Sequence, residues 1–556
     1  MKKSLLLLFV AAACQHLNVA AQNKSATDNY FEISKNLEIT SNIYKELNEY
    51  YVDPIEPGRM LKNSLDAMLK GLDPYTVYIS ESEIEDHQLL SAGEYGGIGA
   101  SIFKSQGGHF VFDAPIQNGP ADKAGIRSGD ILVAIDGKPI DKLSIEQIGL
   151  LFRGAPKTSL DIGIRHPVTQ KVSSKRIIRE SVDIPTINYA ALIGRNKDIA
   201  YVHLGQFTPN CSMELRYKLD SLKAANQNKL SGVVLDLRDN PGGLLDEAVK
   251  ICNLFVDKGQ TIVTTKGNSD EWDKSFATTG PAWDLQIPLT VLINSASASA
   301  SEIVAGTIQD LDRGIVIGQR SYGKGLVQVI KNIGYNSRLK ITTAKYYTPS
   351  GRCIQSTDYS HKNPDGSVNS IADSLKVLFK TRKGRSVYDG GGIEPDLNIV
   401  AGKNTTLISS LQSGKVLFDY ATLYYHKHTS IAPAREYYFS AADFEDFKKW
   451  LQSQPAAYQT ESEKKIEELK QFLKQEQYGN AVQSAVSQLE QQLKQYKLTE
   501  VENHKKEIIS LLNSEIVSRY YYQRGTIENK LSKDDEAIKQ ALEVLYDTRM
   551  YSSILQ

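Results

Sequence analysis

The chain has 556 residues, of which 41% are hydrophobic and 23% are charged, proportions that are ordinary for globular proteins. A chain of this length holds roughly three or four domains. Its 65 basic and 65 acidic residues balance, which argues against a nucleic-acid-binding protein because such proteins carry a basic excess.

Residues 1–21 have the pattern of an export signal. Lys2 and Lys3 give a positive start, residues 5–13 an apolar run, and residues 19–21 a small-residue cleavage site. The apolar run is too short to span a membrane, so we expect an exported and soluble mature protein. Lipid attachment at Cys14 is the second interpretation, since the residues before this cysteine lack the usual leucine.

Three cysteines follow the signal, namely Cys211, Cys252 and Cys353. An odd number at irregular spacing does not make a disulfide framework. Cys252 falls within a helical apolar pattern, which indicates a core residue.

Residues 22–94 are predicted to be a helical region. Apolar side chains recur at helical spacing over residues 35–51 and again over residues 60–69. Asp73 and Pro74 then end the second helix, because proline disfavours a helical residue before it. We expect these helices to be packing elements.

Residues 95–181 carry the motifs of a further domain, which the resemblance given below implies to be β-rich with two helices. A glycine-rich segment precedes a strand at residues 100–104, and the run N-G-P-A-D-K-A-G-I-R-S-G-D-I-L-V-A-I-D-G follows from residue 118. This region resembles a PDZ domain. The resemblance implies that a peptide adds a strand to the sheet edge while loop N–H groups hold its C-terminal carboxylate. The implied peptide-binding loop is Gly96, Gly97, Ile98 and Gly99, with Ile98 lining the pocket for the last side chain; a plain hairpin turn is the alternative.

Residues 182–402 are predicted to be a mixed α/β core. Strand-like runs at residues 199–204, 231–237 and 289–293 precede helical patterns, and further strands follow residue 328. Glycines 242 and 243 come just after the second run, at a strand-to-helix turn whose backbone N–H groups are free to face an anion. A structural tight turn would use the same glycines.

Residues 403–556 are predicted to be an α-helical extension. Amphipathic helices are expected at residues 444–451, 461–472, 481–496 and 508–522. Dimerisation, docking of a partner that delivers substrates, and stability alone are all open roles for this extension.

A run of small residues, S-A-S-A-S-E, links the strand at residues 289–293 to the helix that follows. A serine at such a turn has an exposed hydroxyl beside backbone donors that can hold an oxyanion. Ser299 and Glu302 also match the capping box S-x-x-E, a structural use of the same serine. Further on, Lys324 lies between two glycines in the segment S-Y-G-K-G-L-V-Q.

These two segments, together with D-L-R-D-N-P-G-G at residues 236–243, resemble the C-terminal processing peptidases, which are serine proteases with a Ser–Lys dyad. The resemblance covers roughly residues 30–400. It implies that Ser299 is the nucleophile, chosen over Ser297 and Ser301 because Lys324 follows it by 25 positions. Lys324 would then be the general base.

The resemblance also implies the remaining site residues. The N–H of Ala300 and that of either Gly242 or Gly243 would form the oxyanion hole, and Gln328 would orient the lysine amine. Side chains at 324 and 328 share one face of an extended segment, which agrees with this role for Gln328. Because a free lysine has a pKa of ~10.4, burial must lower the pKa of Lys324 before it can accept the serine proton.

The sequence therefore predicts a periplasmic serine endopeptidase that cleaves protein substrates near apolar C-termini, with no metal and no cofactor. The nine histidines match neither a Ser-His-Asp protease motif nor a metal-site pattern. A latent protease that needs an adaptor protein and a non-catalytic PDZ scaffold of the cell envelope are the alternatives. Whether the chain forms homo-oligomers stays open.

Overall fold

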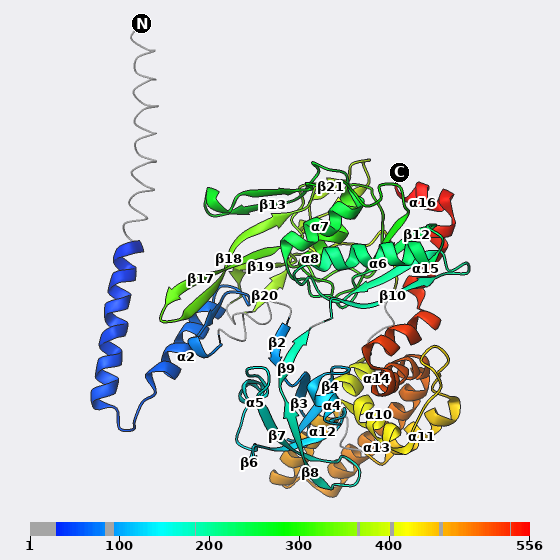
Figure 1. The fold of residues 1–556 in the computed structure, drawn as a ribbon. Coiled ribbons are helices and arrows are strands. Elements are labelled where there is room, and N and C mark those ends of the chain that lie inside the picture. The colour runs from blue at the N-terminus through cyan, green and yellow to red at the C-terminus, as the bar shows by residue number, and fades with distance from the viewer. Residues whose placement is uncertain are drawn as a thin grey trace, which may run out of the picture. The chain divides into compact units, whose positions relative to one another are not determined.

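The computed structural model describes residues 29–83, 94–183, 185–363, 367–400, 405–454, 460–533 and 535–556 (Figure 1). The predicted export signal and Cys14 lie outside these residues. The chain divides into two units, of which the first contains the described residues up to Glu81 together with Ile330–Lys340. The second contains Ser82–Val329 and Ile341–Gln556. In the described ranges, no helix is both long enough and apolar enough to cross a membrane.

The first unit begins with the two predicted helices, which are confirmed. Its first elements are a helix at residues 29–50, α2 (Pro57–Lys70) and β1 (Val77–Ile79). Between α2 and β1, the Asp73 carboxylate accepts hydrogen bonds from the N–H groups of Tyr75 and Thr76 at 2.7 and 2.8 Å. This aspartate turn directs the chain into β1, which pairs antiparallel with residues 338–340.

The predicted PDZ-like region forms a β-rich domain with two short helices. Its sheet has the order β3-β4-β5-β7-β8, so β3 is an edge strand, and β6 pairs with β5. A separate pair joins β2 to β9. The elements are β2 (Glu94–Gly97), β3 (Ala100–Lys104), β4 (Phe110–Pro115), α4 (Pro120–Lys123), β5 (Ile131–Ile135), β6 (Lys138–Pro139), α5 (Ile145–Phe152), β7 (Ser159–Arg165), β8 (Val172–Ile178) and β9 (Glu180–Asp183).

The glycine loop of this domain is shorter than predicted. Gly96 and Gly97 belong to β2, because they pair with β9, and only Ile98 and Gly99 form the turn into β3. The Ile98 side chain is 1% exposed and lies in the apolar core of the domain. The role of Ile98 in lining the pocket for the last side chain of a peptide stays a prediction.

The centre of the second unit is a six-stranded sheet with helices on both faces (Figure 1). Its order is β10-β11-β12-β15-β16-β23, and every neighbouring pair is parallel except β10 and β11. This arrangement confirms the mixed α/β prediction. The strands are β10 (Ile187–Ile193), β11 (Ile199–Leu204), β12 (Gly232–Asp236), β15 (Leu289–Ile293), β16 (Ile315–Gly318) and β23 (Leu397–Asn398).

Helices α6 (Cys211–Ala225), α7 (Leu245–Phe255) and α8 (Ala300–Asp310) cover one face of this sheet through a common apolar core. A smaller sheet lies beyond them, in which β18 pairs with both β13 and β17. The further strands are β13 (Thr261–Gly267), β14 (Lys274–Ala277), β17 (Leu326–Gly334), β18 (Ser337–Tyr347), β19 (Thr357–Lys362), β20 (Val368–Ser370), β21 (Leu378–Lys380) and β22 (Ser386–Tyr388).

The C-terminal extension is helical, as predicted. Its first helices and the start of α14 share an apolar core of their own. After a kink at Tyr522 (φ 56°), the rest of α14 and the last two helices cover the second face of the central sheet. The helices are α9 (Thr406–Ser413), α10 (Val416–Lys427), α11 (Ala441–Gln452), α12 (Glu461–Gln475), α13 (Asn480–Asn503), α14 (Lys505–Ser532), α15 (Glu536–Tyr546) and α16 (Thr548–Ile554).

Candidate active site

Ser299 lies at the turn between β15 and α8, in a backbone conformation that is rare for an L-residue. Its φ is 56° and its ψ is −114°. Strained backbone of this kind persists where the surrounding structure holds it, and it clusters at functional sites. Ala300 begins α8, and among the described residues its N–H has no acceptor. The turn thus presents a serine side chain next to a free backbone donor.

The other two serines of the run have structural roles. The Ser297 hydroxyl donates to the Leu237 carbonyl oxygen at 2.8 Å, and the Ser301 hydroxyl donates to the Asn240 carbonyl oxygen at 2.9 Å. Both serines are fully buried, whereas Ser299 is partly exposed. Of these three serines, Ser299 alone is open to a substrate.

Gly242 packs directly against Ser299. A Cβ atom on Gly242 would lie 2.8 Å from the Ser299 Cβ and 2.7 Å from the Ala298 carbonyl oxygen, distances that real Cβ atoms do not show. The Gly242 N–H donates to the Asn240 Oδ1 at 2.9 Å. Glycine is therefore needed here for close approach, and its N–H is already in use.

Gly243 forms a parallel bridge with Phe207. The hydrogen bonds of this bridge come from the residues before and after Gly243. The Phe207 N–H donates to the Gly242 carbonyl oxygen at 3.0 Å, and the Leu244 N–H donates to the Phe207 carbonyl oxygen at 2.9 Å. Within the described part of the chain, the Gly243 N–H has no acceptor. Of the two glycines named from sequence, Gly243 has the free donor.

Replacing Gly242 with alanine is expected to lower kcat on the order of 100-fold, because the added Cβ must displace the turn that carries Ser299. Initial rates on a peptide substrate measure this effect. Gly259→Ala is the matched control: Gly259 has a similar positive φ of 83° but nothing within 4 Å of an added Cβ. Equal rates for the two variants would contradict the close-packing argument.

Glu302 joins the serine turn to the lysine segment. Its Oε2 accepts hydrogen bonds from the N–H groups of both Ser299 (2.8 Å) and Lys324 (2.9 Å). Its Oε1 accepts the Ser321 hydroxyl at 2.6 Å and the Gly323 N–H at 2.7 Å. Burial raises the pKa of Glu302 to about 7, although these hydrogen bonds act to lower it. The sequence predicted Glu302 only as a helix cap. In the structure, one oxygen atom of its carboxylate accepts the N–H groups of both Ser299 and Lys324.

Lys324 and Gln328 are held by close contacts around them. A Cβ atom on Gly323 would lie 2.4 Å from the Ser356 Cβ, so the segment before Lys324 must pass close to its neighbour. Gln328 lies in β17, where its Nε2 donates to the Thr342 Oγ1 at 3.2 Å. This bond fixes the glutamine side chain in the strand that follows the lysine, while its role toward the lysine amine stays a prediction.

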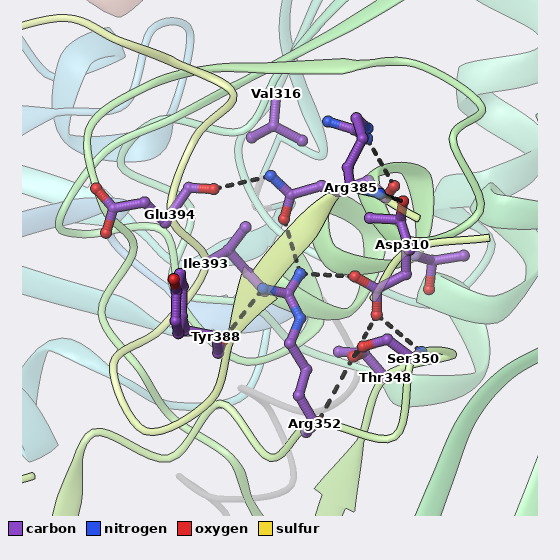
Figure 2. Close-up of polar contacts among 12 residues, drawn as sticks. Asp310, Val316, Thr348, Ser350, Arg352, Arg385, Tyr388, Ile393 and Glu394 are labelled. Atoms are coloured by element: carbon purple, nitrogen blue, oxygen red, sulfur yellow. Dashed lines mark hydrogen bonds and ion pairs between the residues drawn. The ribbon is translucent and has the colours of Figure 1, made fainter. Parts of the chain in front are cut away.

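A buried polar network anchors the other end of α8 (Figure 2). The Asp310 carboxylate accepts hydrogen bonds from the Arg352 Nη2 at 2.7 Å, the Thr348 hydroxyl at 2.6 Å and the Ser350 N–H at 3.0 Å. Arg352 is fully buried and also donates to the Gln309 Oε1 at 2.7 Å. The helix that begins beside Ser299 is thus fixed at both of its ends.

The backbone carbonyl oxygens of Ile98 and Gly99 form hydrogen bonds within the β-rich domain. The Ile98 carbonyl oxygen accepts the Ala121 N–H and the Gly99 carbonyl oxygen accepts the Ile116 N–H, each at 2.8 Å. Among the residues that the structure describes, the N–H groups of Ile98 and Gly99 have no acceptor. Two free donors therefore lie at the start of edge strand β3.

Cysteine and metal chemistry find no support in the described ranges. Burial raises the pKa of Cys252 to about 12 and also raises the pKa of Cys211 and Cys353. Such thiols remain protonated and are poor nucleophiles. No group of three or more His, Cys, Asp or Glu side chains in the described ranges could hold a metal ion.

Three segments match models of known protein families. Residues 198–366 match peptidase family S41, and residues 111–165 match the PDZ domain. Residues 407–545 match a model described as the C-terminal helical domain of a probable PDZ-protease.

Two curated relatives are similar over most of their own length. A carboxy-terminal-processing protease of Bartonella bacilliformis is 35% identical over 352 residues, which are 63% of this chain and 80% of the relative. A probable CtpA-like serine protease of Staphylococcus aureus is 31% identical over 349 residues, or 62% and 68% of the two chains. The solved photosystem II D1 C-terminal processing protease is 24% identical, with coverage of 64% of this chain and 86% of that one and a TM-score of 0.37.

Proposed function

Since the chain belongs to the carboxy-terminal-processing proteases of peptidase family S41, and is thus a serine-type peptidase, we propose that Ser299 and Lys324 are its catalytic dyad. One observation carries this proposal. Glu302 Oε2 accepts the backbone N–H groups of both residues, although 25 positions separate them in the sequence, which supports the pairing. Ser299 is also partly exposed and has a strained backbone, features that cluster at functional sites.

The proposed reaction follows acyl-enzyme chemistry. The neutral Lys324 amine takes the proton of the Ser299 hydroxyl as the Ser299 oxygen attacks the scissile carbonyl carbon. The tetrahedral intermediate then collapses, the peptide C–N bond breaks, and the leaving amine takes the proton from Lys324. Lys324 then deprotonates a water molecule that attacks the ester carbon; the bond between this carbon and the Ser299 oxygen breaks, and the lysine ammonium returns the proton to that oxygen.

The N–H groups of Ala300 and Gly243 are the proposed oxyanion hole. Both are without acceptors among the described residues, while the Gly242 N–H is bound to Asn240. Preorganised donors of this kind are effective because they need no reorganisation as negative charge develops on the carbonyl oxygen. In the same proposal, Gln328 orients the Lys324 amine.

The β-rich domain is proposed to bind the C-terminal tail of the substrate as an added strand on β3. The free N–H groups of Ile98 and Gly99 would hold the terminal carboxylate. Export to the periplasm is proposed on the pattern of residues 1–21 alone. A latent state that needs an adaptor protein is the remaining alternative to constitutive activity.

A test uses one unfolded protein made with three C-termini: an apolar tail, the same tail amidated, and a tail ending in two aspartates. We expect products cut near the apolar C-terminus. Cleavage of the amidated tail should be about tenfold slower, because amidation removes the charged carboxylate that would accept hydrogen bonds from the domain. Mass spectrometry of the products measures both. Equal cleavage of all three substrates would contradict tail recognition, and cleavage spread along the chain would contradict C-terminal processing.

A further inference from the structure

We propose that Asp535, in the C-terminal extension, is a positioning residue for peptide hydrolysis; this inference rests on the proposed function. Asp535 lies at the start of α15 and forms an ion pair with Arg238, which is 297 residues away in the sequence. Arg238 follows β12 and immediately precedes residues 239–243, the oxyanion turn, which contains the proposed donor Gly243. The extension thereby touches the segment that shapes the site.

The Arg238 guanidinium is held between two carboxylates. Its Nη1 donates to both oxygens of Asp535 at 3.1 and 2.8 Å, while its Nε and Nη2 donate to Asp236 at 2.9 and 2.6 Å. Asp236 is fully buried and also accepts the Tyr201 hydroxyl at 2.7 Å. Burial alone would raise the pKa of Asp236, but Arg238 brings it down to about 2. Asp236 is therefore ionised at neutral pH and remains paired with Arg238.

Asp535 is needed to complete the set of acceptors for Arg238. The side chains of Arg238 and Asp535 are only 20% and 12% exposed, so water replaces a lost partner poorly. Asp236 occupies one edge of the planar guanidinium, and Asp535 occupies the other. Without Asp535, the Nη1 donors have no acceptor among the described residues. The guanidinium is then held by Asp236 on one side only and can move.

Movement of Arg238 acts on the oxyanion turn through the backbone. The Arg238 N–H donates to the Asp236 Oδ1 at 3.0 Å, and the next residue, Asp239, donates its N–H to the Asn294 Oδ1 at 3.0 Å. The Asn240 carbonyl oxygen then accepts the Ala298 N–H at 3.1 Å, one residue before Ser299. A shift at Arg238 therefore reaches both the oxyanion turn and the serine turn.

The extension holds Asp535 rigidly. The Asp535 carboxylate caps α15 by accepting the Ile538 N–H at 3.2 Å, and α15 packs on the central sheet through buried Ala541 and Val544. Asp547 is a matched control, because it caps α16 by accepting two N–H groups at 3.0 Å and makes no ion pair within the described residues. Both aspartates are helix caps of the same extension, and only Asp535 contacts Arg238.

The test compares Asp535→Asn, Asp535→Glu and Asp547→Asn in the full-length protein. We expect Asp535→Asn to lower kcat by roughly 10- to 100-fold with KM within about twofold of wild type, because catalysis is sensitive to small displacements of reacting groups. Asp535→Glu, which keeps the carboxylate, should recover part of the rate. Asp547→Asn should keep kcat within about twofold, because asparagine caps a helix about as well as aspartate and Asp547 makes no ion pair within the described residues.

Hydrogen–deuterium exchange gives a readout that does not depend on activity. Amides of residues 239–243 should exchange faster in Asp535→Asn than in wild type and Asp547→Asn. Equal kcat and equal exchange in the two asparagine variants would overturn the inference. If wild type cleaves no substrate, the proposed function fails, and the exchange comparison alone decides whether Asp535 holds the oxyanion turn.

Discussion

Alanine in place of Ser299 or Lys324 is expected to lower kcat by on the order of 10⁴-fold or more, because the proposed nucleophile and base would act as one unit in the acylation step. Lys324→Arg should be as inactive as Lys324→Ala, since a guanidinium keeps its proton at any working pH. Initial rates on the apolar-tailed substrate measure all three variants.

The controls for this experiment lie in the same segments. Ser295 is an exposed serine of the same turn, so Ser295→Ala should keep full activity. Circular dichroism and melting temperature must show that each inactive variant is folded. Substantial cleavage by folded Ser299→Ala would identify a different nucleophile or a contaminating protease.

Arg352→Met is expected to reduce the free energy of unfolding by about 3–5 kcal/mol, because it leaves the buried Asp310 carboxylate without its charged partner. Arg352 and Asp310 are both fully buried, with 2.7 Å between the Arg352 Nη2 and the Asp310 Oδ1. Replacing both residues in Arg352→Met/Asp310→Leu should recover part of the loss, since no isolated charge then remains, while the Thr348 hydroxyl and the Ser350 N–H lose their acceptor. Urea unfolding at constant pH measures the three free energies.

An exposed ion pair serves as the control for Arg352. Arg320 pairs with Glu394 and Asp373, and its side chain is 46% exposed. Arg320→Met should therefore cost about 1 kcal/mol or less. A similar loss for Arg320→Met and Arg352→Met would contradict the view that the buried network around Asp310 fixes the end of α8.

Much of the proposed catalytic region could be predicted because its signals are local. The apolar strand at residues 289–293, the small residues after it and the helix that follows are neighbours in sequence, and the structure has β15, the turn and α8 in that order. The glycines at 242 and 243 likewise follow directly on β12. Which of the two has a free N–H could not be predicted, because it depends on Asn240 and Phe207 folding back onto the turn.

The parts that sequence reasoning missed depend on contacts between distant segments. Glu302 satisfies the capping-box pattern locally, so nothing in the sequence indicated that it also binds Ser321 and Lys324. Arg352 lies in a loop with proline, serine and glycine, a pattern that predicts a surface residue. In the structure it is fully buried and paired with Asp310. The last two helices of the extension have ordinary amphipathic patterns, which show an apolar face but not the sheet that it covers.

The most direct test of the Ser299–Lys324 dyad is covalent labelling with a fluorophosphonate, followed by peptide mapping. We predict one adduct per chain, on Ser299, and labelling of Lys324→Ala that is slower by about 100-fold or more because its serine lacks a base. Folded Ser299→Ala should take up no label. An adduct on Ser297, Ser301 or any residue outside this turn, or equal labelling rates for wild type and Lys324→Ala, would contradict the dyad.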